Sequence, residues 1–339
     1  MDHINMSYRL EKRILYIIIG LVSLASVSTA QDPIYTQFYA NPLYLNPALT
    51  GVEKCPRVVM NYRNQWPGLN QGNGNFVTYS ASYDQNVDAL SGGLGLLLMQ
   101  DREGANGVFK TTRATLMYSY NLNVNRKLSL RFGLSAAYFQ KSIDWSQLTF
   151  GDMIDERYGF VYNTGETEPK QSVQNVDFGA GFLAYTKYFY GGFAVDHLTE
   201  PQEDFLLADE TVLPRKFTGH LGFVIPINKR HPEDGAISPN IMYQSQGKAF
   251  SLTPTANQLF IGLYGYKGPI VGGLWYRGKD AFAVLIGMKT DHVRFGYSYD
   301  ITVSKLTNKS GGSHEVSLAL IFNCKPKKKQ FRALSCPEF

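Results

Sequence analysis

Apolar and polar side chains alternate along most of the chain from residue 57 onward. In the stretch 292–300, Val293, Phe295 and Tyr297 fall on one face, and Arg294 falls on the other. A period of two is the pattern of a β-strand, whose successive side chains point to opposite faces. The alternation predicts about 14 strands, over residues 57–66, 76–84, 92–101, 111–121, 129–138, 175–185, 188–196, 215–226, 236–245, 258–266, 269–277, 280–289, 292–300 and 314–322.

The composition of the polar face decides between a soluble sheet and a membrane barrel. This face carries mainly Ser, Thr, Asn and Gly with a few Arg and acids, and Tyr, Phe or Trp often stand near the strand ends. Charged residues make up only 18% of the chain, against about 25% in soluble domains. Apolar-out, polar-in alternation with aromatic ends is typical of outer-membrane barrels. The sequence therefore predicts an all-β fold, a transmembrane antiparallel β-barrel.

The lengths of the links between strands predict how the barrel is oriented. An even number of strands places both chain ends in the periplasm. The short links at Asn123–Asn125 and Lys267–Gly268 suit periplasmic turns, which are short in such barrels. The longer polar links 141–174, 199–214 and 300–313 suit extracellular loops.

The chain begins with the pattern of a secretory signal peptide. Arg9, Lys12 and Arg13 precede the apolar run 14–27, and the small-residue site ending at Ala30 follows. A membrane anchor is the alternative, but the run is short for a spanning helix and the small residues favour cleavage. We therefore divide the chain into a cleaved signal peptide (1–30), an N-terminal segment (31–55), the barrel (56–323) and a basic periplasmic tail (324–339).

Residues 31–55 lie outside the strand pattern and are predicted to plug the lumen. Two Asn-Pro pairs interrupt regular structure, and many aromatic residues argue against a disordered periplasmic leader, which is the alternative. Glycines on the lumen face, such as Gly133 and Gly181, would leave room for such a segment. The candidate plug residues are Tyr35, Phe38, Tyr39, Asn41, Pro42, Tyr44, Asn46 and Pro47.

Eight charged residues are predicted to face the lumen. One interpretation is a charged channel or ligand site; the other is an ion-pair network that braces the wall and holds the plug. The network is favoured because buried charges must be paired and because arginine holds carboxylates through two parallel hydrogen bonds. These residues are Arg63, Arg113, Arg131, Asp177, Arg277, Arg294, Asp300 and Glu315.

Motifs for catalysis or metal binding are missing from the sequence. The six His show no ligand spacing and there is no GxSxG motif, so we expect no catalytic residue, metal or cofactor. The net charge of +5 is too small and too dispersed for nucleic-acid binding. Among three cysteines, Cys324 and Cys336 could close a loop in the tail, or Cys55 could pair with either.

Several segments in order resemble the PorP/SprF family of the type IX secretion system. They include QDPIYTQFYANPLYLNPALTG at 31–51, NYRNQWPG at 61–68, AVDHLTEP at 194–201, FGYSYDIT at 295–302 and SHEVSLALIF at 313–322. The resemblance implies a non-enzymatic outer-membrane barrel that helps to export a surface adhesin, or anchors it in gliding bacteria.

The expected partners follow from the same resemblance. They are the adhesin or its C-terminal sorting domain, a periplasmic lipoprotein or ring component of the apparatus, and outer-membrane lipid. The link 141–174 is where members would differ, so we expect partner identity to reside there. The alternative function is an outer-membrane channel for small or hydrophobic molecules, with residues 31–55 as a movable hatch.

Overall fold

The computed structural model describes most of the chain between residues 32 and 324. The described ranges are 32–53, 55–69, 76–125, 127–155, 157–166, 170–205, 211–228, 230–231, 234–247, 256–278, 280–304 and 309–324. The predicted signal peptide and nearly all of the predicted basic tail lie outside these ranges, as does Cys336. Within them, no helix has the length and apolar character needed to cross a membrane.

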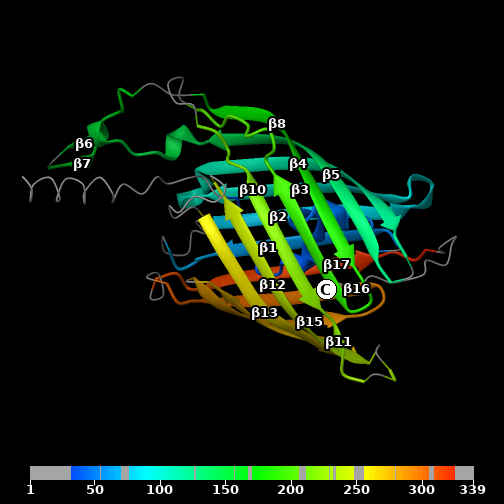
Figure 1. The fold of residues 1–339 in the computed structure, drawn as a ribbon. Helices are drawn as coiled ribbons and strands as arrows, with labels where there is room; N and C mark the ends of the chain where they lie inside the picture. The colour runs from blue at the N-terminus through cyan, green and yellow to red at the C-terminus, as the bar shows by residue number, and fades with distance from the viewer. Residues whose placement is uncertain are drawn as a thin grey trace, which may run out of the picture.

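A closed antiparallel barrel accounts for most of these residues (Figure 1). Each barrel strand pairs with its neighbours in the chain, and β1 pairs with β17 to close the ring. The strands are β1 (Arg57–Gln65), β2 (Phe76–Val87), β3 (Gly92–Glu103), β4 (Phe109–Asn123), β5 (Ser129–Ile143), β8 (Ser172–Tyr185), β9 (Phe189–Asp196), β10 (Lys216–Phe223), β12 (Gly235–Gln246), β13 (Ala256–Lys267), β14 (Ile270–Arg277), β15 (Ala281–Lys289), β16 (Val293–Thr302) and β17 (Ser313–Ile321). The predicted barrel of about 14 strands is confirmed.

The two faces of the wall differ as the alternation predicts. Outward side chains such as Leu116, Leu134 and Ile286 are large, apolar and exposed. Inward positions hold buried Ser, Thr, Asn and charged side chains. So large an exposed apolar surface is stable only against lipid.

Three long connections lie at the same end of the barrel. We call the end where β1 begins and β17 finishes the terminal end, and the opposite one the loop end. The terminal end holds the links 124–128 and 268–269, together with η4 (Asp88–Leu90) and the short strand β11 (Ile225–Pro226). The loop end holds η5 (Ala105–Gly107) and the long links 144–171, 197–215 and 303–312.

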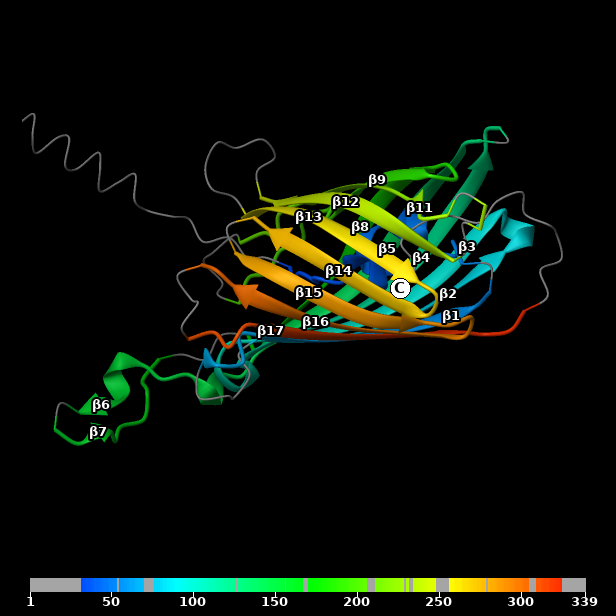
Figure 2. The same ribbon diagram turned by 90° about the horizontal axis from the view of Figure 1, so that it is seen from below.

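The link 144–171 contains structure of its own. It holds η6 (Trp145–Gln147), η7 (Gly151–Met153) and a hairpin of β6 (Ile154–Asp155) and β7 (Gly159–Phe160). Asp152 binds the hydroxyl of Thr164 and the amide of Gly165, which ties the two sides of the link together. Figure 2 shows the hairpin projecting well beyond the loop end of the barrel.

A disulfide joins Cys55 to Cys324 at the terminal end. The predicted pair Cys324–Cys336 is therefore wrong, and the alternative with Cys55 holds. The physical reason is the closure of the ring: Arg57 lies opposite Ile321 in the β1–β17 ladder, which brings the Cα atoms of the two cysteines within 5.5 Å.

Residues 32–53, which we call the N-terminal segment, lie inside the ring of strands and appear in blue in Figure 2. The segment forms η1 (Phe38–Ala40), α2 (Pro42–Leu45) and η2 (Pro47–Leu49). Each Asn-Pro pair starts a new turn, because proline suits the first helical position. Asn46 also caps η2 by accepting a hydrogen bond from the amide of Ala48 at 2.9 Å.

Candidate functional site in the lumen

The N-terminal segment runs through the lumen from one end of the barrel to the other. Asp32 meets Lys216, the first residue of β10, at the loop end. Glu53 meets Arg294, near the start of β16, at the terminal end, with 3.1 Å between Nη2 and Oε2. The chain therefore enters the lumen at the loop end and leaves it beside the disulfide.

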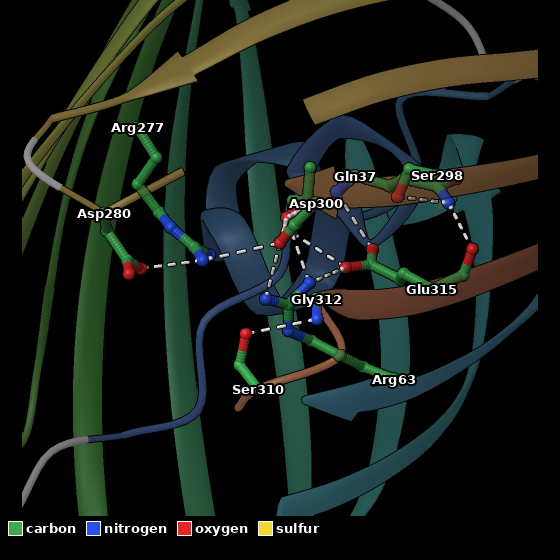
Figure 3. A network of polar contacts seen from close by, with 10 residues as sticks. Gln37, Arg63, Arg277, Asp280, Ser298, Asp300, Ser310, Gly312 and Glu315 are labelled. Atoms are coloured by element: carbon green, nitrogen blue, oxygen red, sulfur yellow. Dashed lines mark hydrogen bonds and ion pairs between the residues drawn. The ribbon is translucent and has the colours of Figure 1, made fainter. Parts of the chain in front are cut away.

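The central cluster consists of Arg63, Arg277, Asp300 and Glu315 (Figure 3). Arg63 places one guanidinium nitrogen 2.9 Å from Glu315 Oε2 and the other 2.8 Å from Asp300 Oδ2. Arg277 lies 3.4 Å from the same Asp300 oxygen and 2.7 Å from Asp280. The charges of the central cluster are thus neutralised by residues from several strands, as buried ions require.

The N-terminal segment binds this cluster through its backbone and two short side chains. The amides of Thr36 and Gln37 donate to the two carboxylate oxygens of Glu315 at 2.8 and 2.9 Å. The Thr36 hydroxyl donates to Asp300 and accepts from Arg63. Gln37 is fully buried, donates to the Glu315 carbonyl at 2.9 Å and accepts from Ser317 at 2.7 Å. Every polar group of Gln37's amide therefore has a partner in the wall.

The loop-end cluster consists of Asp32, Asp177, His197 and Lys216. His197 places Nδ1 2.7 Å from Asp177 and Nε2 2.9 Å from Asp32. The Lys216 ammonium also lies 2.8 Å from Asp32. Asp177 is further approached by Arg113, at 3.9 Å. In this cluster a carboxylate of the N-terminal segment bridges two basic side chains of the barrel.

The electrostatics of the loop-end cluster favour the charged forms of both partners. Burial acts to raise the pKa of Asp32, but the charges of Lys216 and His197 outweigh it and hold that pKa well below its usual range. Burial acts to lower the pKa of His197, but the Asp32 charge and the Asp177 hydrogen bond raise it above its ordinary value. Both pKa shifts therefore favour the ionised form of this bridge.

The part of the N-terminal segment that lies towards the terminal end of the barrel is held mainly through its backbone. Arg131 donates to the carbonyls of Thr50 and Gly51, at 2.7 and 3.3 Å. Asp84 accepts from the Gly51 amide at 2.8 Å and pairs with Arg57 at 2.9 Å. These contacts satisfy carbonyl and amide groups that a short 3₁₀ turn leaves without partners.

Two glycines of the wall allow the segment to approach closely. A Cβ added at Gly133 would lie 2.2 Å from the amide nitrogen of Ala48, and one at Gly181 would lie 2.1 Å from Asn46 Oδ1. Both distances are shorter than those that real Cβ atoms make with their neighbours. Any larger residue at either position is therefore incompatible with the observed place of the segment.

The predicted plug residues are all buried, except Tyr44, which is partly buried. Phe38 packs edge-on against Trp275, with 4.7 Å between ring centroids, and Tyr39 packs against Tyr190 at 5.7 Å. Tyr44 lies under the Lys216 ammonium, 4.5 Å from the ring centroid. A cavity of about 30 Å³, lined in part by Leu43 and Tyr44, is what remains between this part of the segment and the wall.

Of the eight predicted lumen charges, the structure brings Asp300 and Glu315 together around Arg63 and joins Arg277 to them. Asp177 belongs to the loop-end cluster, where Arg113 approaches it, and Arg131 and Arg294 each contact the segment on their own. Sequence reasoning missed Asp32, His197 and Lys216. The available signal was the marker segment 194–201, which places a histidine directly after the end of a strand. Among the described residues, no group of His, Cys, Asp and Glu is arranged to hold a metal ion.

The closed barrel, its apolar outer face and its polar, filled lumen define an outer-membrane β-barrel protein. A family comparison specifies which one: residues 27–320 match the type IX secretion system membrane protein PorP/SprF. The chain therefore belongs to the PorP/SprF family and is an outer-membrane component of that secretion system.

Solved structures of other barrels are similar at low sequence identity. The toluene transporter TbuX of Ralstonia pickettii is 10% identical with a TM-score of 0.47, covering 83% of this chain and 93% of that one. The monoaromatic hydrocarbon channel CymD is 13% identical with a TM-score of 0.46, covering 84% and 93%. Omp33 of Acinetobacter baumannii is 10% identical with a TM-score of 0.42, covering 80% and 100%. Curated protein sequences contain no match to the chain.

Proposed function

We propose that this protein binds a secreted surface protein, an adhesin or its C-terminal sorting domain, and links it to a periplasmic lipoprotein or ring component of the apparatus. It acts by binding rather than by catalysis. Family membership supports the secretion role. The projecting β6–β7 hairpin carries the proposal for the binding element, because Tyr158 and Phe160 on it are 71% and 64% exposed. Exposed aromatic residues on a projecting loop are typical of a protein-binding surface.

The proposal includes an orientation and a plug. The signal peptide 1–30 directs export, the terminal end, where β1 begins and β17 finishes, faces the periplasm, and the loop end with its hairpin faces the outside. The N-terminal segment closes the lumen as a plug, a role supported by its buried contacts with both ionic clusters. In this orientation Asp32 lies near the extracellular mouth, where a bound surface protein can reach it.

Affinity purification from native outer membranes tests the binding role. A tagged chain should recover a large surface protein together with periplasmic components. The double variant Y158S/F160S should lose the surface protein and keep the periplasmic components. The matched control Y188S alters a half-exposed tyrosine at the terminal end and should keep both. Recovery of the barrel alone from the unaltered protein would contradict the proposal and favour the channel.

A further inference from the structure

The outer face of the wall is hollowed across strands β17, β1, β2, β3 and β4. The depression has a volume of about 590 Å³, within the roughly 300–1,000 Å³ of small-molecule sites. Its floor is low because Ala81 and Ala114 stand among much larger neighbours. The outward side chains that line it are Met60, Tyr62, Tyr79, Ala81, Leu98, Gln100, Thr112, Ala114, Val316 and Leu318.

Strand register orders this surface into three rows that change from apolar to basic towards the loop end. The first row is wholly apolar apart from a tyrosine hydroxyl and runs Leu318, Met60, Ala81, Leu98, Ala114, Tyr138. The second is rich in tyrosine and amides and runs Val316, Tyr62, Tyr79, Gln100, Thr112, Gln140. The third runs His314, Asn64, Val77, Arg102, Lys110, Ser142. The change from an apolar row to a basic row matches the change in a membrane from acyl chains to headgroups.

The third row places two cations side by side above the depression. Arg102 and Lys110 lie directly opposite each other in the β3–β4 ladder, and both are exposed. Gln100 accepts from Arg102 Nε and Nη2 at 3.2 and 3.1 Å, which orients the guanidinium along the wall. Their row carries no carboxylate to neutralise them. The rows are about 7 Å apart, since side chains on one face of a strand repeat every two residues.

We propose that this surface binds lipid A, with an acyl chain in the depression and a phosphate between Arg102 and Lys110. The charge pair selects an anionic headgroup, and arginine and lysine are the usual phosphate ligands. The apolar floor selects a hydrocarbon chain, because it offers no polar group to satisfy. Lipid A is chosen over a phospholipid because the cations lie at the loop end, which faces the outer leaflet in the proposed orientation.

Native mass spectrometry of the intact protein in mild detergent tests the site. Delipidated protein is titrated with purified lipid A, with dephosphorylated lipid A and with phosphatidylglycerol. We expect lipid A to bind at least tenfold more tightly than either of the others. The double variant R102Q/K110Q should lose this preference and bind both forms of lipid A alike. The variant A114L, which fills the depression, should weaken lipid A tenfold or more.

Two matched variants control for general effects on the barrel. A136L adds the same side chain to an outward alanine outside the depression, and R215Q removes a half-exposed arginine that is paired with Glu200. Both should bind lipid A as the unaltered protein does. Equal binding by all variants, a preference for phosphatidylglycerol, or a dimer mass in place of bound lipid would each overturn the assignment. Folding of every variant is checked by its resistance to protease, which is independent of lipid.

Discussion

The two ionic clusters that hold the N-terminal segment are assembled differently. In the central cluster, Arg63, Asp300 and Glu315 come from the adjacent strands β1, β16 and β17. With Arg277 from β14, the two positive and two negative charges balance within the wall. The segment adds hydroxyl and amide groups to an ion pair that the barrel already supplies. In the loop-end cluster, the bridging carboxylate Asp32 belongs to the segment itself.

The difference teaches which contacts belong to the barrel and which depend on the N-terminal segment. Strand register alone assembles the central cluster, so it should survive withdrawal of the segment. The loop-end cluster is complete only when Asp32 is in place, and His197, which follows the end of β9, gives it a titratable side chain whose pKa the Asp32 charge raises. We therefore expect the central cluster to set barrel stability and the loop-end cluster to set how firmly the segment is held.

The largest effect should come from breaking the central cluster. R63M leaves Asp300 and Glu315 buried without their shared partner, and removing one member of a buried ion pair costs about 3–5 kcal/mol. We expect the free energy of unfolding in urea to fall by that amount. R215M, which removes a half-exposed arginine, should change it by less than about 0.5 kcal/mol. Equal stability of R63M and the unaltered protein would show that the cluster does not brace the wall.

A smaller effect should come from displacing the segment without touching either cluster. G133V places carbon atoms where the backbone of Ala48 lies, and overpacking of this kind costs about 1–3 kcal/mol. We expect the segment to become sensitive to protease and the barrel to conduct ions in a planar bilayer. G219V is the matched control, because a Cβ at Gly219 meets nothing within 4 Å. A protected segment in G133V would contradict the observed close approach.

The smallest effect should be a pH dependence confined to the loop-end cluster. Because its folded pKa is raised, His197 contributes stability that is fully present below its unfolded pKa of about 6.5. That contribution is lost as the pH rises through the raised folded value. The lowered pKa of Asp32 gives a contribution that is present above about pH 4 and lost in stronger acid.

Hydrogen exchange of residues 32–40 measures this dependence. We expect protection of the segment to be greatest between about pH 4 and 6.5 and to decline at higher pH, as His197 loses its proton. H197Q should abolish the alkaline decline, whereas H292Q, in a turn at the terminal end, should leave it unchanged. A decline of the same size in H197Q would assign the titration to another group.

The period-two alternation was sufficient to predict the strands and the inward direction of the charged residues on them, because successive side chains of a strand point to opposite faces. All eight predicted lumen charges point inward for that reason. The change of period after residue 55 likewise separated the N-terminal segment from the barrel. Hydrophobic pattern and local chemistry therefore determined the fold class, the number of strands and the candidate residues.

Only the tertiary structure decided which of these residues meet. Arg63 lies opposite Glu315 because β1 pairs with β17 across the whole length of the chain, and the same closure joins Cys55 to Cys324. Asp32, His197 and Lys216 come together because the segment passes through the lumen and begins at the end of the barrel where the link from β9 to β10 lies. Such contacts depend on ring closure and threading, which join residues far apart in sequence and leave no trace in local periodicity.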